Sequence, residues 1–362
     1  MKKIIQSSSI ILLISFIFFG CETKKPAIGN EDEIIVFADS VEYLELEPVL
    51  LQIFSKTIYT PIPEQLFLLN RKDISEISKY QHRKNIVIVA PFGTESETSN
   101  FIGNIVSPEL KTKIENDSLF VINKYDLWAR EQLVMVLTAP TLEKLKYNIL
   151  NEEDDLVYFF QKISDKRLLK SIYNPTFENE KQEAEFLKKY DWLIYVQKDF
   201  MLAKDDSLNN FVWLRRSPSS NLERWIFVHW IENASPAFLN ADSIYAERNK
   251  LTKRYFRTTD NSAYIEIADD YLSSTEVNFN GKYALFTQGL WRMNDKSMGG
   301  PFVNYTFYDE NSKRIYMLDG SVFAPKFYKK SLIQQVDVLL QSFKPGHEID
   351  QSKREDLLNL LD

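Results

Sequence analysis

The only cysteine of this chain, Cys21, directly follows a short apolar run, and this arrangement constrains the rest of the protein more than any other feature. Two lysines follow the first methionine, residues 10–19 are largely apolar, and Gly20 precedes the cysteine. A basic start, a short apolar centre and a small residue at the cut are typical of a secretory signal. We therefore expect residues 1–20 to be a lipoprotein signal peptide and Cys21 to be lipidated. A plain secretory signal with an incidental cysteine is the alternative.

A lipid on Cys21 would limit both the fold and the chemistry of the mature protein. With its sole thiol consumed, the chain has no disulfide, no thiolate nucleophile and no cysteine metal site, so a hydrophobic core must stabilise it. Apolar residues make up 44% of the chain and aromatic residues 14%, which is enough for a sizeable core. The formal net charge of −7 disfavours nucleic acid and anionic lipid headgroups as partners. We therefore expect no nucleic-acid partner and attachment to the membrane through the N-terminal lipid.

Composition and local patterns divide the chain after the signal into four segments. Residues 21–32 are charged and contain one proline and one glycine, which predicts a flexible tether. Strand and helix signals alternate over residues 33–173, an N-terminal α/β half. Residues 174–344, a C-terminal α+β half, are richer in antiparallel strand signals. Residues 345–362 form a polar tail, which we expect to be a frayed end or a loose amphipathic helix.

Start signals and hydrophobic periodicity predict the individual elements. Asp39 followed by Glu42 resembles a capping box and predicts a helix from there to about residue 56. Ser107 followed by proline predicts another helix start. Further helices are expected at 141–173, with a break near 152–155, at 240–256 and at 329–343. Strands are expected at 33–38, 65–69, 85–90, 119–123, 132–138, 192–197, 211–216, 223–232, 263–268, 282–287, 303–308 and 314–318. This mixture predicts the α+β class, with mixed or antiparallel sheets, helices packed on one face, and two ferredoxin-like halves as one arrangement that fits.

Motifs for the common enzyme chemistries are absent from the sequence. The three histidines lie far apart, so no closely spaced zinc ligands are found, and we expect neither a metal site nor a cofactor. Neither a Gly-x-Ser-x-Gly nor a Ser-x-x-Lys pattern is present, and no Gly-x-Gly loop that would hold a phosphate. Paired carboxylates remain open as a glycan-hydrolase mechanism, with candidates among Glu266, Asp269, Asp270 and Glu276.

Arginine and tryptophan residues of the C-terminal half are candidates for binding. Arg215 and Arg216 lie near Arg224 on the next predicted strand, and such a cluster binds an anion through bidentate hydrogen bonds or forms surface salt bridges. Exposed tryptophan rings stack on sugars, whereas buried ones fill the core, and both interpretations are open for this chain.

The stretches 289–293, 298–303 (Met-Gly-Gly-Pro-Phe-Val) and 314–326 resemble a family of uncharacterised Bacteroidota cell-envelope lipoproteins, known only as a domain of unknown function. The resemblance implies a lipoprotein and provides no catalytic residues. In the predicted turn Gly299-Gly300-Pro301, the glycines allow positive φ or close backbone approach. This turn either leads tightly into the next strand or presents Trp291 and Phe302 to a ligand.

These observations together predict a lipid-anchored protein of the cell envelope that is not an enzyme. Because no acidic block follows Cys21, we expect an outer-membrane location facing the periplasm. The protein is expected to be a binding or assembly module for an envelope protein or a glycan, and an envelope glycan hydrolase with paired carboxylates is the alternative. The candidate binding residues are Trp291, Gly299, Gly300, Pro301, Phe302, Arg215 and Arg216.

Overall fold

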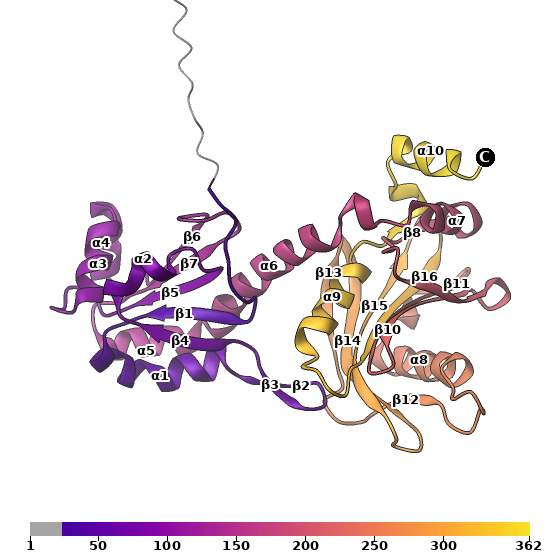
Figure 1. The fold of residues 1–362 in the computed structure, drawn as a ribbon, viewed down its shortest axis with the longest axis horizontal. Coiled ribbons are helices and arrows are strands. Elements are labelled where there is room, and N and C mark those ends of the chain that lie inside the picture. Colours follow the sequence, from indigo (N-terminus) through magenta and orange to yellow (C-terminus); the bar gives the residue numbers. More distant parts are fainter. Residues whose placement is uncertain (1–23) are drawn as a thin grey trace, which may run out of the picture.

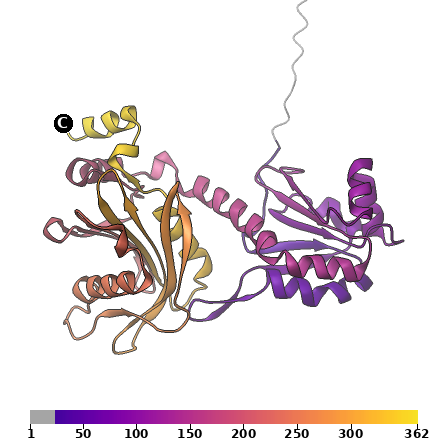
Figure 2. The same ribbon diagram turned by 180° about the vertical axis from the view of Figure 1, so that it is seen from behind.

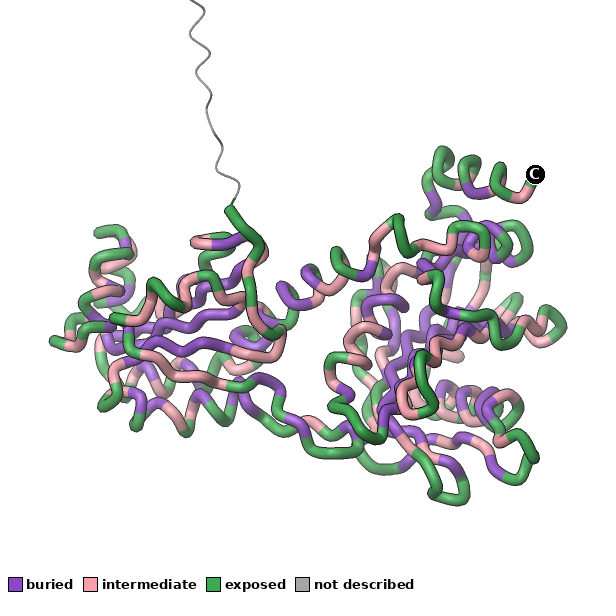
Figure 3. Tube along the Cα trace, in the orientation of Figure 1, coloured by how far each residue is buried: buried purple, intermediate pink, exposed green. Residues whose placement is uncertain are grey.

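Two lobes, connected by the long helix α6 (Glu153–Ile172), make up the computed structural model, which describes residues 24–362 (Figure 1). The predicted signal peptide and Cys21 lie outside the described residues. The strands at the centre of each lobe are buried, whereas the connecting loops are exposed (Figure 3). No helix within residues 24–362 combines the length and the hydrophobicity that a membrane span requires.

The N-terminal lobe (24–173) contains a five-stranded sheet in the order β4-β1-β5-β7-β6. Its four parallel strands are β4 (Leu68–Lys72), β1 (Glu33–Phe37), β5 (Asn85–Val89) and β7 (Leu133–Leu137), and β6 (Val121–Tyr125) runs antiparallel at the edge. The central strands are continuous apolar runs, as is typical of parallel strands with both faces covered.

Helices cover both faces of this sheet, because alternate side chains of each strand point in opposite directions. One face packs on α1 (Ser40–Phe54), α5 (Leu142–Asn151) and α6, and the other on α2 (Ile77–Tyr80), α3 (Glu97–Ile105) and α4 (Pro108–Glu115). A hairpin of β2 (Thr57–Tyr59) and β3 (Pro63–Gln65) extends from this lobe toward the other one (Figure 1).

The start of the described chain packs against the N-terminal lobe. Pro26 forms a β-bridge with Arg130, and the amide of Ile28 donates to the carbonyl of His82 at 2.9 Å. The Lys24 ammonium donates to two carbonyls of the loop that follows β6. The flexible tether predicted for residues 21–32 is therefore corrected over residues 24–32, because these backbone and side-chain bonds fix the segment to the lobe.

The C-terminal lobe (174–362) contains an eight-stranded antiparallel sheet in the order β12-β14-β15-β16-β11-β10-β9, with β13 paired to β14. Helix α8 (Ala241–Tyr255) covers one face, and α9 (Lys330–Leu340) and α7 (Glu180–Tyr190) contribute to the core on the other (Figure 2). The strands are β9 (Met201–Asp206), β10 (Phe211–Ser219), β11 (Leu222–Ile231), β12 (Ile265–Ile267), β13 (Ser273–Phe279), β14 (Lys282–Met293), β15 (Gly299–Asp309) and β16 (Arg314–Phe323).

The C-terminal residues fold back onto this lobe. The short strand β17 (Lys344–Pro345) pairs with β8 (Trp192–Leu193), a 3-10 turn covers Gly346–Glu348, and α10 (Gln351–Asn359) packs on α7. Leu357 of α10 is buried against Leu187. The segment expected to be a polar tail thus forms a docked helix, held by only a few leucines on an otherwise polar surface.

The predicted α+β class is confirmed, but neither lobe has the ferredoxin-like arrangement considered from the sequence. A ferredoxin-like half has an antiparallel sheet of four strands, whereas helical crossovers make β4, β1, β5 and β7 of the N-terminal lobe parallel. The sheet of the C-terminal lobe is antiparallel but has eight strands. Helices cover both faces of each sheet rather than one, because both faces carry buried apolar side chains.

Two contacts fix the lobes to each other. Arg167 of α6 is buried; its guanidinium donates to Glu31 at 2.9 Å and to Asn85 at 2.8 Å, which fastens the helix to the N-terminal lobe. Two residues before Arg167, Asp165 of α6 accepts a hydrogen bond from Gln334 of α9 at 2.7 Å, which joins the helix to the C-terminal lobe. The β2–β3 hairpin forms the second contact, which is described below.

Candidate ligand-binding surface between the lobes

The carboxyl ends of β1 and β5 are the place where doubly wound sheets usually bind ligands, because the helices that follow these strands lie on opposite faces. Here Asp39 accepts hydrogen bonds from the amides of Glu97 and Thr98, at 3.0 and 3.1 Å, and from the Thr98 hydroxyl at 2.6 Å. The N-terminus of α3 therefore holds a carboxylate of the chain itself. This position disfavours an anionic ligand such as a phosphate.

Glu42 completes the same polar cluster. Its carboxylate accepts hydrogen bonds from Thr94 Oγ1 at 3.0 Å and Ser96 Oγ at 3.1 Å. Burial raises the pKa of Glu42, and these two hydrogen bonds oppose the shift. The helix predicted from the Asp39–Glu42 capping box does form, but neither carboxylate caps it, since both bind the loop and helix after β5 instead.

The predicted binding residues Trp291 and Phe302 are buried in the C-terminal core. The Trp291 indole donates to the carbonyl of Val322 at 3.2 Å, and Phe302 lies beneath the guanidinium of Arg248, 3.6 Å from the ring centroid. Both rings are about 98–99% buried, so neither presents a face to a ligand. The candidate role of these two rings in binding is therefore corrected to a role in packing.

The neighbouring residues Gly299, Gly300 and Pro301 are part of β15 and do not form a turn. A Cβ on Gly300 would lie 2.0 Å from the carbonyl oxygen of Val322, and one on Gly299 would lie 2.9 Å from the carbonyl oxygen of Trp291. The glycines thus allow close backbone approach inside the sheet, and Pro301 is buried beside them.

The predicted arginine cluster is formed, with carboxylate partners for two of its members. Arg215 binds Glu223 through two nitrogens, one at 3.0 Å, and Arg216 pairs with Asp199. Arg224 is buried against a glutamine of α9, and burial together with the nearby Arg216 charge lowers the pKa of Arg224 to about 10. The geometry favours the salt-bridge interpretation for Arg215 and Arg216.

The acidic residues considered for glycan hydrolysis do not face a common cleft. Glu266 pairs with Arg292 at 3.0 Å, and Asp269, Asp270 and Glu276 are exposed on loops and an edge strand. None of these carboxylates lines either of the two pockets described next. No observation on them favours catalysis.

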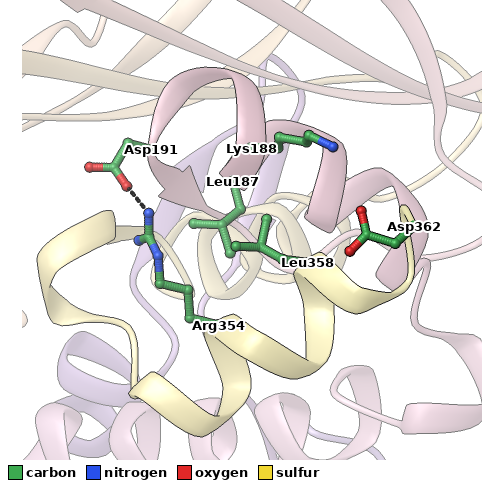
Figure 4. A pocket seen from close by; sticks show the side chains of 6 residues that line it. All are labelled: Leu187, Lys188, Asp191, Arg354, Leu358 and Asp362. Carbon is green, nitrogen blue, oxygen red and sulfur yellow. Dashed lines mark hydrogen bonds and ion pairs between the residues drawn. The ribbon is translucent and has the colours of Figure 1, made fainter.

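Two shallow pockets flank the docked helix α10. The first, about 530 Å³, has Leu187 and Leu358 at its centre and the Asp191–Arg354 ion pair, 2.8 Å, at one end, with Lys188 and Asp362 at the other (Figure 4). The second, about 470 Å³, lies beside Phe186 and Lys189 of α7. The charged groups lie on the rims and do not converge on a point. We therefore interpret the two pockets as gaps left where α10 packs on α7, not as ligand sites.

Exposed aromatic and apolar side chains lie on the three segments that meet where the hairpin contacts the C-terminal lobe. Tyr59 of β2 stacks on Tyr271 of the β12–β13 loop, with ring centroids 4.2 Å apart and planes 11° apart. The other members belong to the hairpin tip and to the loop before α9. We call the group the junction patch; its members are Tyr59, Ile62, Tyr271, Phe327 and Tyr328, which are 43–76% exposed.

Hydrogen bonds between the lobes join the hairpin to the start of α9, next to the junction patch. Glu64 of β3 is buried and accepts hydrogen bonds from the amides of Lys329, at 2.7 Å, and Lys330, at 3.1 Å. These amides begin α9, whose own N-cap residue provides no side-chain cap. One lobe thus caps a helix of the other, which holds the hairpin and the loop before α9 together.

One group among the described residues could hold a metal ion, namely Asp309, His347 and Glu348. The sequence search for closely spaced ligands missed it because Asp309 lies in a different segment from the other two. Of the remaining histidines, His82 is exposed, and His229 is buried with Nδ1 2.8 Å from the carbonyl oxygen of Asn210.

Comparison with known proteins gives family matches over both lobes. Residues 27–173 match the model of a domain of unknown function, DUF8532, and residues 178–342 match that of another domain of unknown function, DUF4837. The signature at 298–303 falls within the second match. No curated protein sequence matches the chain.

Solved structures give only distant likenesses. The Ran-binding protein Mog1p of Saccharomyces cerevisiae has 13% identity, with 45% of this chain and 93% of that chain covered and a TM-score of 0.29. LpqN of Mycobacterium tuberculosis, described as involved in cell envelope biogenesis, has 11% identity, with 42% and 82% covered and a TM-score of 0.26. At these TM-scores neither likeness carries an argument. The family matches confirm the expected likeness to uncharacterised domains of unknown function, with one match in each lobe.

Proposed function

We propose that this chain is a non-catalytic binding module of the cell envelope, anchored by a lipid on Cys21, that binds a partner protein through the junction patch. The observation that carries the proposal is the patch itself: five exposed aromatic and apolar side chains contributed by both lobes. Tyrosine and other aromatic residues are enriched at the centres of protein interfaces. Single exposed apolar residues are common on protein surfaces, whereas several of them close together usually mark an interaction site.

The arrangement of polar groups supports binding over catalysis. The cluster at the carboxyl ends of β1 and β5 is satisfied by hydrogen bonds within the chain, and the acidic candidates of the C-terminal lobe are exposed or paired. Catalysis needs groups that converge on a reacting atom in a cleft. Instead of such a cleft, the described residues form a surface to which both lobes contribute exposed side chains.

The position of the chain start supports an orientation for the anchored protein. Lys24, the third residue after Cys21, is bonded to the N-terminal lobe, so a lipid would hold this lobe within roughly 10 Å of the bilayer surface. The described chain begins at the top of the N-terminal lobe, whereas the β2–β3 hairpin lies at the bottom (Figures 1 and 2). In this orientation the junction patch points away from the membrane, into the periplasm.

Labelling with a fatty-acid probe tests the anchor. The natural chain is expected to take up the label and to sediment with membranes, whereas Cys21→Ser should do neither. Equal labelling of both chains would contradict lipidation at Cys21.

Chemical cross-linking in intact cells tests the partner. The natural chain and a control variant of another exposed tyrosine, Tyr147→Ser, should give the same cross-linked protein, and Tyr271→Ser and Tyr328→Ser should lose it. An adduct that survives in both patch variants would contradict the proposed surface. Retention of envelope polysaccharide by the natural chain without any protein adduct would support the glycan alternative instead.

A further inference from the structure

The C-terminal segment brings two metal-ligating side chains next to the end of β15. Strand β17 pairs with β8, and Gly346 packs so closely on Asp191 that an added Cβ would lie 2.1 Å from its Oδ1. The turn Gly346–Glu348 is therefore held in place, and His347 and Glu348 face Asp309.

The spacing of the three ligand atoms suits a bound metal ion better than a hydrogen bond. His347 Nε2 lies 3.5 Å from Asp309 Oδ1 and 3.7 Å from Glu348 Oε1, and all three atoms lie within 4.8 Å of one another. Hydrogen bonds between such groups measure about 2.7–3.2 Å. Zinc bonds of about 2.0–2.2 Å in a tetrahedron separate the ligand atoms by roughly 3.3–3.6 Å.

Asp309 provides an independent observation, because its carboxylate is buried and held by hydrogen bonds on one oxygen. The side chain is 1% exposed, and Oδ2 accepts hydrogen bonds from the amide of Ser312 at 2.9 Å and from its hydroxyl. The other oxygen, Oδ1, lies 3.5 Å from His347 Nε2. A cation between Oδ1 and Nε2 would bind the carboxylate without breaking either hydrogen bond on Oδ2.

The surrounding groups are those of a supported metal site. Ser312 fixes the Asp309 carboxylate, as residues around metal ligands usually do. Asn311 Nδ2 lies 2.9 Å from His347 Nε2, so a bound ion would replace this contact, and water would complete the coordination. The Lys282 ammonium pairs with Glu348, and a metal ion bound to the Glu348 carboxylate would replace this contact. His347 and Glu348 are about one-third exposed, which leaves a path for an ion from solvent.

We propose that Asp309, His347 and Glu348 bind a divalent metal ion, with Zn²⁺ the best match for one imidazole and two carboxylates. The ion fastens the C-terminal segment, including α10, to the β15–β16 hairpin. This role is structural and independent of the partner proposed for the junction patch.

Titration of the detergent-solubilised full chain with ZnCl₂, after removal of metal with a chelator, tests the site. We expect one Zn²⁺ per natural chain, at least a tenfold loss of affinity in His347→Ala and Asp309→Asn, and no change in His82→Ala, which replaces an exposed histidine of the other lobe. Absence of saturable binding by the natural chain, or equal affinity of His347→Ala, would overturn the proposal.

Nuclear magnetic resonance of the histidine rings provides a measurement that needs no folded variant. The chain has three histidines, so the ring signals of one residue, His347, are expected to shift on addition of ZnCl₂. Shifts confined to His82 or His229, or no shift at all, would overturn the assignment.

Discussion

Arg167 of the N-terminal lobe and Arg248 of the C-terminal lobe are both buried in ion pairs, and the two sites show how differently the lobes are specified. In the N-terminal lobe both faces of the parallel sheet are apolar, and Arg167 lies at its edge, where it binds the partly exposed Glu31. In the C-terminal lobe Arg248 reaches into the core and binds the fully buried Asp319, at 2.7 Å from Nε. The stability of the N-terminal lobe therefore comes mainly from hydrophobic burial. The stability of the C-terminal lobe also requires that both members of a buried ion pair are present.

The Arg248–Asp319 pair is part of a network on the sheet face beneath α8. Asn304 donates to Asp319 at 3.1 Å, and the Thr306 hydroxyl donates to Asn304 at 2.7 Å. All of these side chains are buried. A buried network of this kind destabilises the fold strongly when one member is removed alone.

The largest expected effect is therefore that of Arg248→Ala, which leaves the Asp319 carboxylate buried without a cation. We expect the free energy of unfolding to fall by about 3–5 kcal/mol. Urea unfolding followed by tryptophan fluorescence measures it, since five of the six tryptophans lie in the C-terminal lobe. The double variant Arg248→Met with Asp319→Leu should regain much of the loss; if it did not, the cost would come from packing and not from the unpaired charge.

Arg167→Ala should have a smaller effect, because Glu31 can return to water when its partner is lost. The variant loses hydrogen bonds to Glu31 and Asn85 and the contact between α6 and the lobe. We expect a loss of about 2–3 kcal/mol in urea unfolding. A loss larger than that of Arg248→Ala would contradict the contrast between the two arginine sites.

A carboxylate at the contact between α6 and α9 should make the stability pH-dependent. Burial raises the pKa of Asp337 to about 7, with a contribution from the nearby charge of Asp165 and opposing hydrogen bonds from Tyr305 and Gln341. Between the usual pKa near 4 and about 7, the folded chain holds a proton that the unfolded chain lacks, so stability falls as the pH rises through this window.

Asp337→Asn removes this titration. Relative to the natural chain, we expect the variant to be more stable by about 1–2 kcal/mol at pH 8 and equal at pH 4, measured by urea unfolding at both pH values. Equal stability of the two chains at pH 8 would show that Asp337 is ionised in the fold without cost.

The smallest effect is expected at the hairpin. Glu64→Ala leaves the first amides of α9 without their acceptor, which costs about 1 kcal/mol, as for the loss of a helix cap. Hydrogen exchange of the Lys329 and Lys330 amides should accelerate, whereas the N-terminal core should be unaffected. Unchanged exchange at both amides would mean that the hairpin does not cap α9.

The contrast between the two sheets also explains which strands and helices can be predicted from the sequence. The runs that form β1, β5 and β7 are apolar except for Glu33 and Asn85 at their starts. Ser107 and Thr141 cap α4 and α5, and Asn240 caps α8 of the other lobe, so local patterns suffice for these elements. Strands β13 and β9 carry mostly exposed or polar residues and escape prediction. Their place in the sheet depends on pairing with distant strands, which no local pattern records.

The candidate sites were less predictable because contacts between distant segments make them. Asp39 and Glu42 have the spacing of a capping box, yet both bind the loop after β5. Tyr59 and Tyr271 stack across the lobes, and Asp309 meets His347 only when the C-terminal segment docks. Conversely, Trp291 and Phe302, which the sequence singles out, are buried, because Gly299 and Gly300 of β15 allow close packing beside them.

Site-specific photo-cross-linking in intact cells tests the central claim most directly. A photoreactive phenylalanine derivative replaces Tyr328 of the junction patch in one chain and the likewise exposed Tyr147 of α5 in another. The account predicts a protein adduct of one defined mass from position 328 and none from position 147. Adducts from position 147 alone, or none from either position while the chain is membrane-bound, would contradict a partner-binding surface between the lobes.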